Sequence, residues 1–417
     1  MIAAIATRRA AARTPMKRRQ LLQIGLASGV SGASLAGWSG ATAQDDKWGR
    51  LRGYPTGLRG GMERAPEYRV GNYSGGFERI FPHHVIAAPA AASTLAASTR
   101  GEFSYRWGLF GKSPEAYLDH WPATGLLICR DDAIFHESYR FGRTAEMRLT
   151  SWSMAKSVTS LLLGICLDRQ LIGSYDDLAE KYVPRLRGTL HGGVSLRHLS
   201  NMSSGAEVVH ARDNPQIYGR AFNGVRTSID ATVADWNQRR EEPGRSFNYN
   251  ELCPLTLGMV MRAVTGQSLS AFAQEALWQP MGAQADATWT TDSERNEFNC
   301  IGFAATLRDW ARLGLLVANR GQARGVQVVS EAWIDECTRW SGADAQVRYG
   351  RVNRDNGYKA HFWHARPDGS RPFFNGHHGQ RVFIDMPSRT VLVQTALDSE
   401  GLWEPELHAM LDAAARL

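Results

Sequence analysis

Two pairs of predicted strands stand far apart in this chain and constrain its fold more than any other feature. The apolar runs Thr124–Arg130 and Ala133–Tyr139 are joined by two aspartates, which is typical of a β-hairpin. A second pair, Gln380–Met386 and Thr390–Ala396, lies near the C-terminus around a Pro-Ser-Arg turn. The residues between them are mainly helical in pattern, and a helix closes the chain from about residue 404 to 417. We therefore expect an α/β (α+β) fold, in which both chain ends build one antiparallel sheet flanked by helices.

The domain organisation expected from these patterns has three parts. Residues 1–43 form an export signal, residues 44–118 an irregular N-terminal arm rich in Gly-Gly pairs and alanine, and residues 119–417 the folded domain. Within the domain, a helical insertion covers about residues 170–305. With 417 residues and 43% apolar composition, the chain is long enough to bury a large core.

The first 43 residues have the composition of an export signal. Arg18-Arg19 precedes a mildly apolar stretch rich in glycine, serine and alanine, and Ala41-Thr42-Ala43 fits a small-x-small cleavage site. Paired arginines in this position resemble a twin-arginine signal, and a Sec signal or an uncleaved anchor are the alternatives. We expect a periplasmic or secreted protein. No later apolar run is long enough to span a membrane.

The net charge of +7 is concentrated in this leader, which holds six basic residues and no acidic ones. Removing residues 1–43 leaves a formal charge of +1, so we expect no nucleic-acid partner. The five cysteines are scattered and odd in number, which argues against a disulfide framework and predicts that most are buried.

The tetrapeptide Ser153-Met154-Ala155-Lys156 opens a strongly apolar predicted helix. Residues three apart share a helix face, so the serine hydroxyl and the lysine amine can meet. Serine needs a neighbouring base to act as a nucleophile, and lysine is such a base only when burial or nearby positive charge lowers its pKa. Only six of the 48 basic residues are lysine, so a lysine here is informative. Alternatively, Ser153 caps the helix and Lys156 is solvated.

The segment Ser151–Ser160 resembles the serine β-lactamase and penicillin-binding-protein superfamily. The branch it most resembles holds the 6-aminohexanoate-dimer hydrolases and class C β-lactamase-like proteins. Two further segments, Val194–Gly205 and Gly302–Asp309, are similar to the family's later elements. The resemblance covers roughly residues 120–415 and implies a β-lactamase-like fold. It also implies a hydrolase that works through an acyl-enzyme, with Ser153 as nucleophile, Lys156 as its partner and no cofactor.

The family's Tyr-x-Asn element corresponds to Tyr249-Asn250-Glu251 in this chain. By resemblance, Tyr249 assists proton transfer to the leaving group. Glutamate in the third position is a departure from the family. Glu251 would either pair with Lys156 and raise its pKa, which weakens it as a base, or face away and leave orientation to Asn250.

The family's third element corresponds to Gly376-His377-His378-Gly379-Gln380, just before a predicted strand. The resemblance implies an oxyanion hole made by a backbone N–H near Gly379 and Gln380 together with that of Ser153. His377 takes the polar first position, where it would keep positive potential near Lys156 or bind a substrate carboxylate.

Two other patterns occur in the sequence. His361, His364, His377 and His378 suggest metal ligands, but no accompanying carboxylate pattern supports a metal site, and we expect none. The polar segment 210–222 has the composition of a turn-rich stretch that could lie over the site.

These patterns predict a secreted serine hydrolase that cleaves a small-molecule amide or ester, of the 6-aminohexanoate-oligomer hydrolase or esterase type. A β-lactamase, or a penicillin-binding D-peptidase or sensor with slow or no turnover, is one alternative, because Glu251 replaces the family's asparagine. An acyltransferase is another.

Overall fold

A computed structural model describes residues 46–58, 65–99, 102–222, 228–339, 357–366 and 368–417 of the chain. All of these lie in one compact unit, residues 43–417. The predicted export signal, residues 1–43, falls outside the described residues. Within the described part, no helix is long and apolar enough to cross a membrane.

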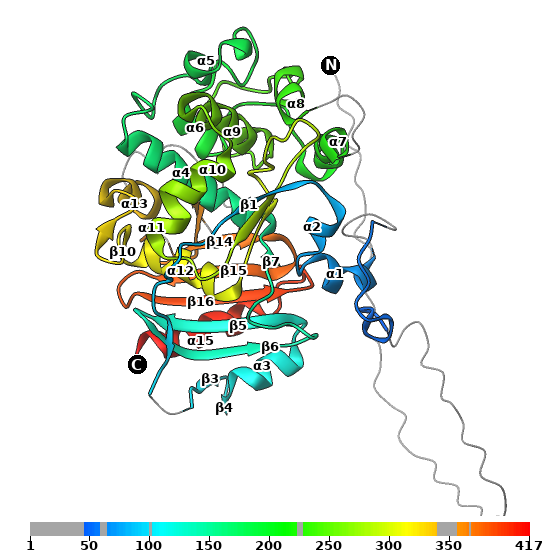
Figure 1. Cartoon of the computed structure of the whole chain (residues 1–417), viewed down its shortest axis with the longest axis vertical. Helices are drawn as coiled ribbons and strands as arrows, with labels where there is room; N and C mark the ends of the chain where they lie inside the picture. The colour runs from blue at the N-terminus through cyan, green and yellow to red at the C-terminus, as the bar shows by residue number, and fades with distance from the viewer. Residues whose placement is uncertain (1–45, 59–64, 100–101, 223–227, 340–356, 367) are drawn as a thin grey trace, which may run out of the picture. The chain divides into compact units, whose positions relative to one another are not determined.

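Both ends of the chain contribute to one eight-stranded sheet, as the sequence predicts (Figure 1). The strands, in spatial order, are β12 (Gly357–Lys359), β13 (Phe362–His364), β14 (Pro372–Gly376), β15 (Gln380–Asp385), β16 (Thr390–Ala396), β5 (Ala123–Arg130), β6 (Ala133–Tyr139) and β2 (Ala96–Ala97). All neighbours are antiparallel except β2 and β6, which are parallel. The two predicted hairpins are β5–β6 and β15–β16, and they meet where β16 pairs with β5.

Two helices cover opposite faces of this sheet. Successive residues of a strand point to opposite faces, and on β15 the neighbours Val382 and Phe383 show this. Val382 faces α12 (Leu307–Ala318), where a Cβ on Gly314 would lie 2.9 Å from the valine. The Phe383 ring packs 4.6 Å from that of His408 on α15 (Glu404–Ala415). Glycine at 314 lets α12 approach the sheet closely.

The chain between the two hairpins is mainly helical. The helices are α4 (Ala155–Asp168), α5 (Ala179–Tyr182), η3 (Pro184–Leu186), α6 (Leu196–Ser200), α7 (His210–Phe222), α8 (Ile229–Asp235), α9 (Leu252–Thr265), α10 (Leu269–Ala273), the π-helix η4 (Gln274–Trp278), α11 (Gln279–Met281) and α13 (Glu331–Thr338). Helices α5, α6, α8 and α9 lie at the end of the molecule away from β5 and β6 (Figure 1). The small sheet has the order β1 (His83–Ile86), β8 (Ala287–Thr290), β9 (Phe303–Ala305) and β7 (Leu149–Thr150), and β10 (Gln322–Ala323) pairs with β11 (Val326–Gln327).

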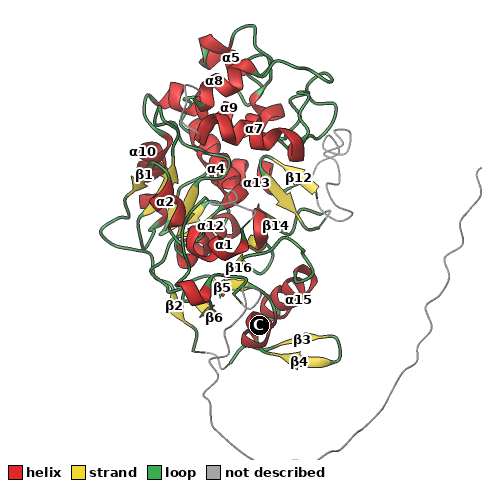
Figure 2. Ribbon diagram, turned by 90° about the vertical axis from the view of Figure 1, so that its right-hand side faces the viewer, coloured by secondary structure: helices red, strands yellow, loops and turns green. Residues whose placement is uncertain are grey.

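The described residues of 44–118, which the sequence predicts to be irregular, form short regular elements. They are η1 (Arg50–Arg52), α1 (Pro66–Asn72), α2 (Gly76–Ile80), β1, β2, β3 (Tyr105–Trp107), β4 (Phe110–Lys112) and α3 (Pro114–His120). Val70, Tyr73 and Phe77 are buried in the core. These elements are too short to show a clear period in the sequence, and packing against the rest of the domain stabilises them. Figure 2 shows the β3–β4 hairpin beside α15.

All five cysteines lie in described parts of the chain, where they are buried and unpaired. The prediction that they are buried apolar residues is confirmed.

Candidate active site

Ser153 lies in the short 3₁₀ turn η2 (Trp152–Met154), which leads directly into α4. The predicted helix is therefore present, with its first turn in a tighter form. From Leu149 to Cys166 every residue except Ser153 is buried. The turn is anchored to the strand β9, because Ser151 N donates to Phe303 O (2.8 Å) and Ser151 Oγ to Ile301 O (3.0 Å). Ser153 is thus the one partly exposed residue on an otherwise buried segment.

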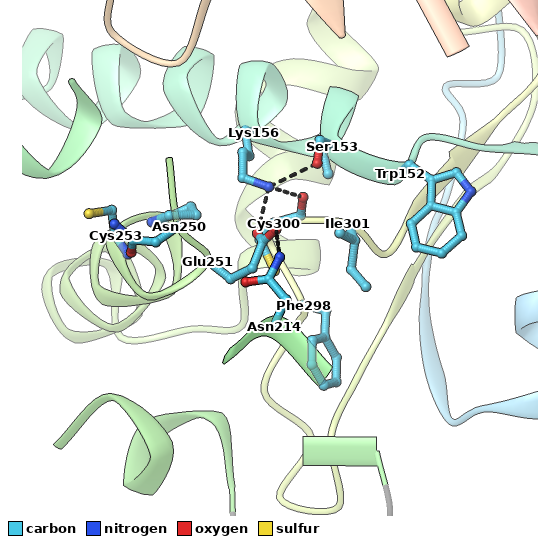
Figure 3. A network of polar contacts seen from close by, with 12 residues as sticks. Trp152, Ser153, Lys156, Asn214, Asn250, Glu251, Cys253, Phe298, Cys300 and Ile301 are labelled. Atoms are coloured by element: carbon cyan, nitrogen blue, oxygen red, sulfur yellow. Dashed lines mark hydrogen bonds and ion pairs between the residues drawn. The ribbon is translucent and has the colours of Figure 1, made fainter. Parts of the chain in front are cut away.

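Lys156 meets Ser153 as the spacing predicts. Its side chain is buried, and Nζ donates hydrogen bonds to Ser153 Oγ (3.0 Å) and to Cys300 O (3.0 Å) (Figure 3). The solvated-lysine alternative is therefore wrong. A second bond, from Thr159 Oγ1 to Asn299 O (2.7 Å), holds the same face of α4 on the segment that presents this carbonyl.

Glu251 takes the first of its two predicted positions, facing Lys156. Its Oε2 lies 2.6 Å from Lys156 Nζ, and both side chains are almost fully buried. Burial by itself lowers the pKa of Lys156, but the Glu251 carboxylate and the neighbouring Tyr249 raise it above the ordinary value. Burial raises the pKa of Glu251, and Lys156 and His210 together bring it below its ordinary value. The resting pair is an ammonium and a carboxylate.

Tyr249 lies beside both groups, as the resemblance implies. Its ring centroid is 4.9 Å from Lys156 Nζ, and hydrogen bonds to Ser153 and Lys156 contribute to its pKa. Burial outweighs these effects and raises the pKa of the tyrosine, so it is a neutral phenol at rest. Its ring packs on Tyr358 (5.9 Å) and Trp363 (5.7 Å), which are core residues behind it.

Three of the predicted site residues, Asn250, Gly379 and Gln380, have structural roles. Asn250 Oδ1 accepts from Cys253 N (3.1 Å) and so caps α9, and the amide donates to Asn248 O (2.7 Å). Gln380 Nε2 donates to the carbonyls of His377, His378 and Ala396. Gly379 has φ +87° in the tight turn η5 (His377–Gly379), where an added Cβ would lie 2.9 Å from that of Ala396. None of these contacts points a side chain at Ser153.

The turn after β14 lies directly against the serine turn. A Cβ on Gly376 would lie 2.2 Å from Ser151 O. The exposed His377 ring packs edge-on against Trp152 (5.5 Å, 82°), while His378 is buried and bonds Tyr73 through Nδ1. Burial lowers the pKa of His378 to about 2, so it is neutral. His377 is therefore next to the site, and His378 is part of its support.

Helix α7 brings three further residues to the site, which sequence reasoning missed. Asn214 Nδ2 donates to Glu251 Oε1 (3.3 Å), His210 Nε2 lies 3.8 Å from the same oxygen, and Tyr218 hydrogen-bonds the carboxylate. The spacing 210, 214, 218 places all three on one helix face. That spacing was the available signal, but the polar composition and Pro215 favoured a turn-rich segment.

The histidines considered as metal ligands have other surroundings. Within the described residues, no three histidine, cysteine, aspartate or glutamate side chains are grouped so that they could hold a metal ion. His361 and His364 are buried, and His361 Nδ1 bonds Tyr358 OH at 2.9 Å.

The fold and the buried Ser–Lys pair define a serine hydrolase. A family model described as beta-lactamase matches residues 115–394, about two thirds of the sequence, and the chain belongs to this family. The resemblance drawn from the motifs is confirmed.

Relatives with known names agree with this class. The chain is 25% identical over 291 residues to a 6-aminohexanoate-dimer hydrolase of Paenarthrobacter ureafaciens, covering 67% of this chain and 74% of the relative. A structure called putative 6-aminohexanoate-dimer hydrolase from Bacillus anthracis superposes with a TM-score of 0.74 at 20% identity, over 84% of this chain and 94% of the other. A family VIII carboxylesterase has a TM-score of 0.55 at 17% identity, over 72% and 95%.

Proposed function

We propose that this protein is a secreted hydrolase that cleaves short linear amides or carboxylic esters through an acyl-enzyme on Ser153. The observation that carries the proposal is the hydroxyl of the partly exposed Ser153, 3.0 Å from the amine of the buried Lys156. A serine and a lysine at this distance, with a phenol beside them, are the parts that nucleophilic catalysis needs.

The proposed reaction has two halves. Ser153 Oγ attacks the substrate carbonyl, its proton passes into the group formed by Lys156 and Tyr249, and the leaving amine or alcohol takes a proton from that group. Water then attacks the acyl-enzyme and releases the acid. Backbone N–H groups of Ser153 and of the turn near Gln380 would stabilise the oxyanion, and the contact between Gly376 and the serine turn supports this assignment.

The substrate class rests on the relatives. The curated relative is named a 6-aminohexanoate-dimer hydrolase, and one structural neighbour is a carboxylesterase. We therefore place linear amides such as 6-aminohexanoate oligomers, and simple esters, ahead of β-lactams and D-amino-acid peptides. A fold does not decide among substrates, so the choice needs a direct measurement.

The test is a panel of three substrates, a p-nitrophenyl ester, a linear 6-aminohexanoate dimer and a chromogenic cephalosporin, with the wild type and Ser153→Ala. We expect turnover of the first two by the wild type, with an acyl adduct on Ser153 visible by mass spectrometry, and loss of at least about 10³-fold in Ser153→Ala. Equal turnover by Ser153→Ala would disprove the nucleophile. A stable cephalosporin adduct without turnover would favour a penicillin-binding sensor, and acyl transfer to added amines an acyltransferase.

Export is proposed from the leader alone. The Arg18-Arg19 pair supports the twin-arginine route, so replacing both by lysine should retain the precursor inside the cell. Unchanged export of that variant would point to another route.

A further inference from the structure

The contacts of Lys156 raise a problem for its role as a base. Nζ has three close oxygen neighbours, Ser153 Oγ at 3.0 Å, Cys300 O at 3.0 Å and Glu251 Oε2 at 2.6 Å. An ammonium has three N–H donors. Two of them bind Ser153 Oγ and Cys300 O, and Glu251 Oε2 faces the same nitrogen as an ion pair. In this arrangement the nitrogen has no lone pair for the serine proton. Lys156 must lose a proton before it can accept one.

The groups in contact with this ammonium differ in what they can accept. Burial keeps Tyr249 protonated, and Cys300 presents a backbone carbonyl. Glu251 is ionised, and its Oε2 is the nearest of the three oxygens. The carboxylate is therefore the base already in place.

We propose that Glu251 receives the proton that Lys156 gives up when Ser153 attacks, so that the buried lysine and glutamate act together as one base. This inference rests on the proposed function and adds a residue that acts through Lys156. A proton moves from Lys156 Nζ to Glu251 Oε2 and leaves a neutral amine and a carboxylic acid. The amine then takes the Ser153 proton as Oγ bonds to the carbonyl carbon and the carbonyl π electrons move to oxygen. On collapse, Lys156 returns its proton to the leaving group, Glu251 returns its proton to Lys156, and the resting pair is restored.

The burial of the pair favours this transfer. Moving a proton within the pair leaves its total charge at zero, so no net charge enters or leaves the protein interior. Low polarity around the pair also reduces the difference in free energy between the ammonium–carboxylate form and the neutral amine–carboxylic acid form. Asn214 from α7 donates to Oε1, which leaves Oε2 directed at the lysine. Asparagine, the family's residue at this position, has no proton-accepting carboxylate.

Several other titratable side chains face the pair, and each affects where its protons leave. Helix α7 contributes His210 and Tyr218, and the segment around the start of α9 contributes Tyr249 and Cys253. Cys300 lies before β9, Tyr358 on β12, and His361 in the turn after β12. Burial raises the pKa of the tyrosines and cysteines in this set and lowers that of His361, so these stay neutral over the working range. His210 is half-exposed and lies 3.8 Å from Glu251, so its charge has to be controlled separately.

The pH dependence of kcat/KM on a p-nitrophenyl ester tests the proposal. This leaving group departs as an anion, so the acid side of the profile reports how the serine is activated. We call the pH below which activity is lost on the acid side of the profile the acid limit. In the wild type we expect it where the Glu251 carboxylate of the resting pair becomes protonated, below the ordinary glutamate pKa of 4.5. If solvent had to deprotonate Lys156, activity would appear only above the ordinary lysine value of 10.5. A wild-type acid limit in that alkaline range overturns the proposal without any variant.

Variants supply the second measurement. In Glu251→Gln and Glu251→Asn no carboxylate can take the proton of Lys156, so the Lys156 amine must already be neutral before Ser153 attacks. We therefore expect the acid limit to move up by about 1–3 pH units, with at least about tenfold lower kcat/KM at pH 5. Glu251→Asp keeps a carboxylate and should hold the acid limit near that of the wild type. An unchanged limit, or a downward shift with faster turnover at neutral pH, would show that Glu251 only restrains Lys156, and this overturns the proposal.

Three controls separate the causes. Glu406→Gln removes the carboxylate of another Lys–Glu pair, Lys112 with Glu406 (2.8 Å), on α15, and should leave the acid limit in place. His210→Gln removes the half-exposed imidazole that helps to lower the pKa of Glu251, so it should raise the acid limit by less than Glu251→Gln does; an equal shift would assign the effect to His210. Ser153→Ala tests the proposed function itself, because full activity there refutes the nucleophile whatever Glu251 does. Circular dichroism and thermal unfolding confirm that each variant is folded.

Discussion

At the scale of single residues, Trp152 shows how the serine is presented. Its backbone φ is +45°, in the left-handed region that residues other than glycine rarely adopt. This conformation costs about 1–3 kcal/mol. Aromatic contacts hold it there: the Trp152 ring packs edge-on against Tyr73 (5.7 Å), Phe77 (5.5 Å) and His377 (5.5 Å). The strained residue comes directly before Ser153, in the turn that carries the nucleophile.

Gly376→Ala tests how closely the site depends on its backbone. The added Cβ would meet Ser151 O at 2.2 Å, so the serine turn or β14 must shift. A displacement of this kind should lower kcat/KM by about 10–100-fold, since catalysis is sensitive to shifts of about 1 Å. The matched control is Gly111→Ala, where a Cβ meets nothing within 4 Å and the activity should stay the same. Near-wild-type activity in Gly376→Ala would mean that the turn relaxes freely.

At the scale of secondary-structure elements, individual carboxylates join segments that are remote in sequence. Glu251 joins α7 to the start of α4 through Asn214 and Lys156. Glu406 on α15 does the same for the N-terminal part of the domain: it accepts from Tyr105 OH (2.7 Å), Lys112 Nζ (2.8 Å) and Trp121 Nε1 (3.0 Å). This carboxylate holds the β3–β4 hairpin against the C-terminal helix.

Glu406→Gln should lower the free energy of unfolding by about 2–3 kcal/mol at neutral pH, because it removes a buried charge with three donors. Burial raises the pKa of Glu406, but the bonds from Lys112, Trp121 and Tyr105 bring it below 4.5. A lowered folded-state pKa means that the stabilisation is present above pH 4.5 and is lost as pH falls through the folded-state value. Urea unfolding at about pH 7 and about pH 3 should therefore show a smaller difference from wild type at the lower pH. The exposed Glu331→Gln is the control, and a difference independent of pH would contradict the reasoning.

At the scale of the whole molecule, the N-terminal segment is part of the active-site support. Tyr73, at the end of α1, accepts a backbone bond from Thr150 N (3.0 Å), just ahead of the serine turn. The same tyrosine stacks on His378 (5.7 Å) and packs on Trp152. The domain that carries the site therefore begins well before the first strand of the predicted hairpin.

Two truncations test this organisation. A protein lacking residues 1–42 should keep full kcat/KM, because all the described residues of the site lie within the unit 43–417. Removing residues 1–101 deletes Tyr73 and Phe77 from around Trp152, so we expect loss of activity together with a lower midpoint of thermal unfolding. An active, stable protein after the second truncation would show that the segment is only an appendage.

The sequence alone determined the features that depend on neighbours along the chain. Apolar runs separated by turn residues predicted both hairpins, and the Ser153–Lys156 spacing predicted that these two side chains meet, because turn and helix geometry depend on residues only a few positions apart. Tyr249 was found through a motif whose form is also local. These signals were sufficient for the fold class and for the central pair of the site.

Tertiary structure decided what depends on partners far apart in the chain. The sequence left two positions open for Glu251, and only packing placed its carboxylate against Lys156, 95 residues earlier, so that the lysine is charged at rest. Gln380 was predicted as a site residue, but its side chain binds backbone carbonyls of its own turn and of β16. The short helices before residue 100, and the face of α7 that carries His210, Asn214 and Tyr218, were also recognised only from the tertiary structure. Burial and electrostatic pairing depend on which surfaces the whole chain brings together, and no local pattern encodes that.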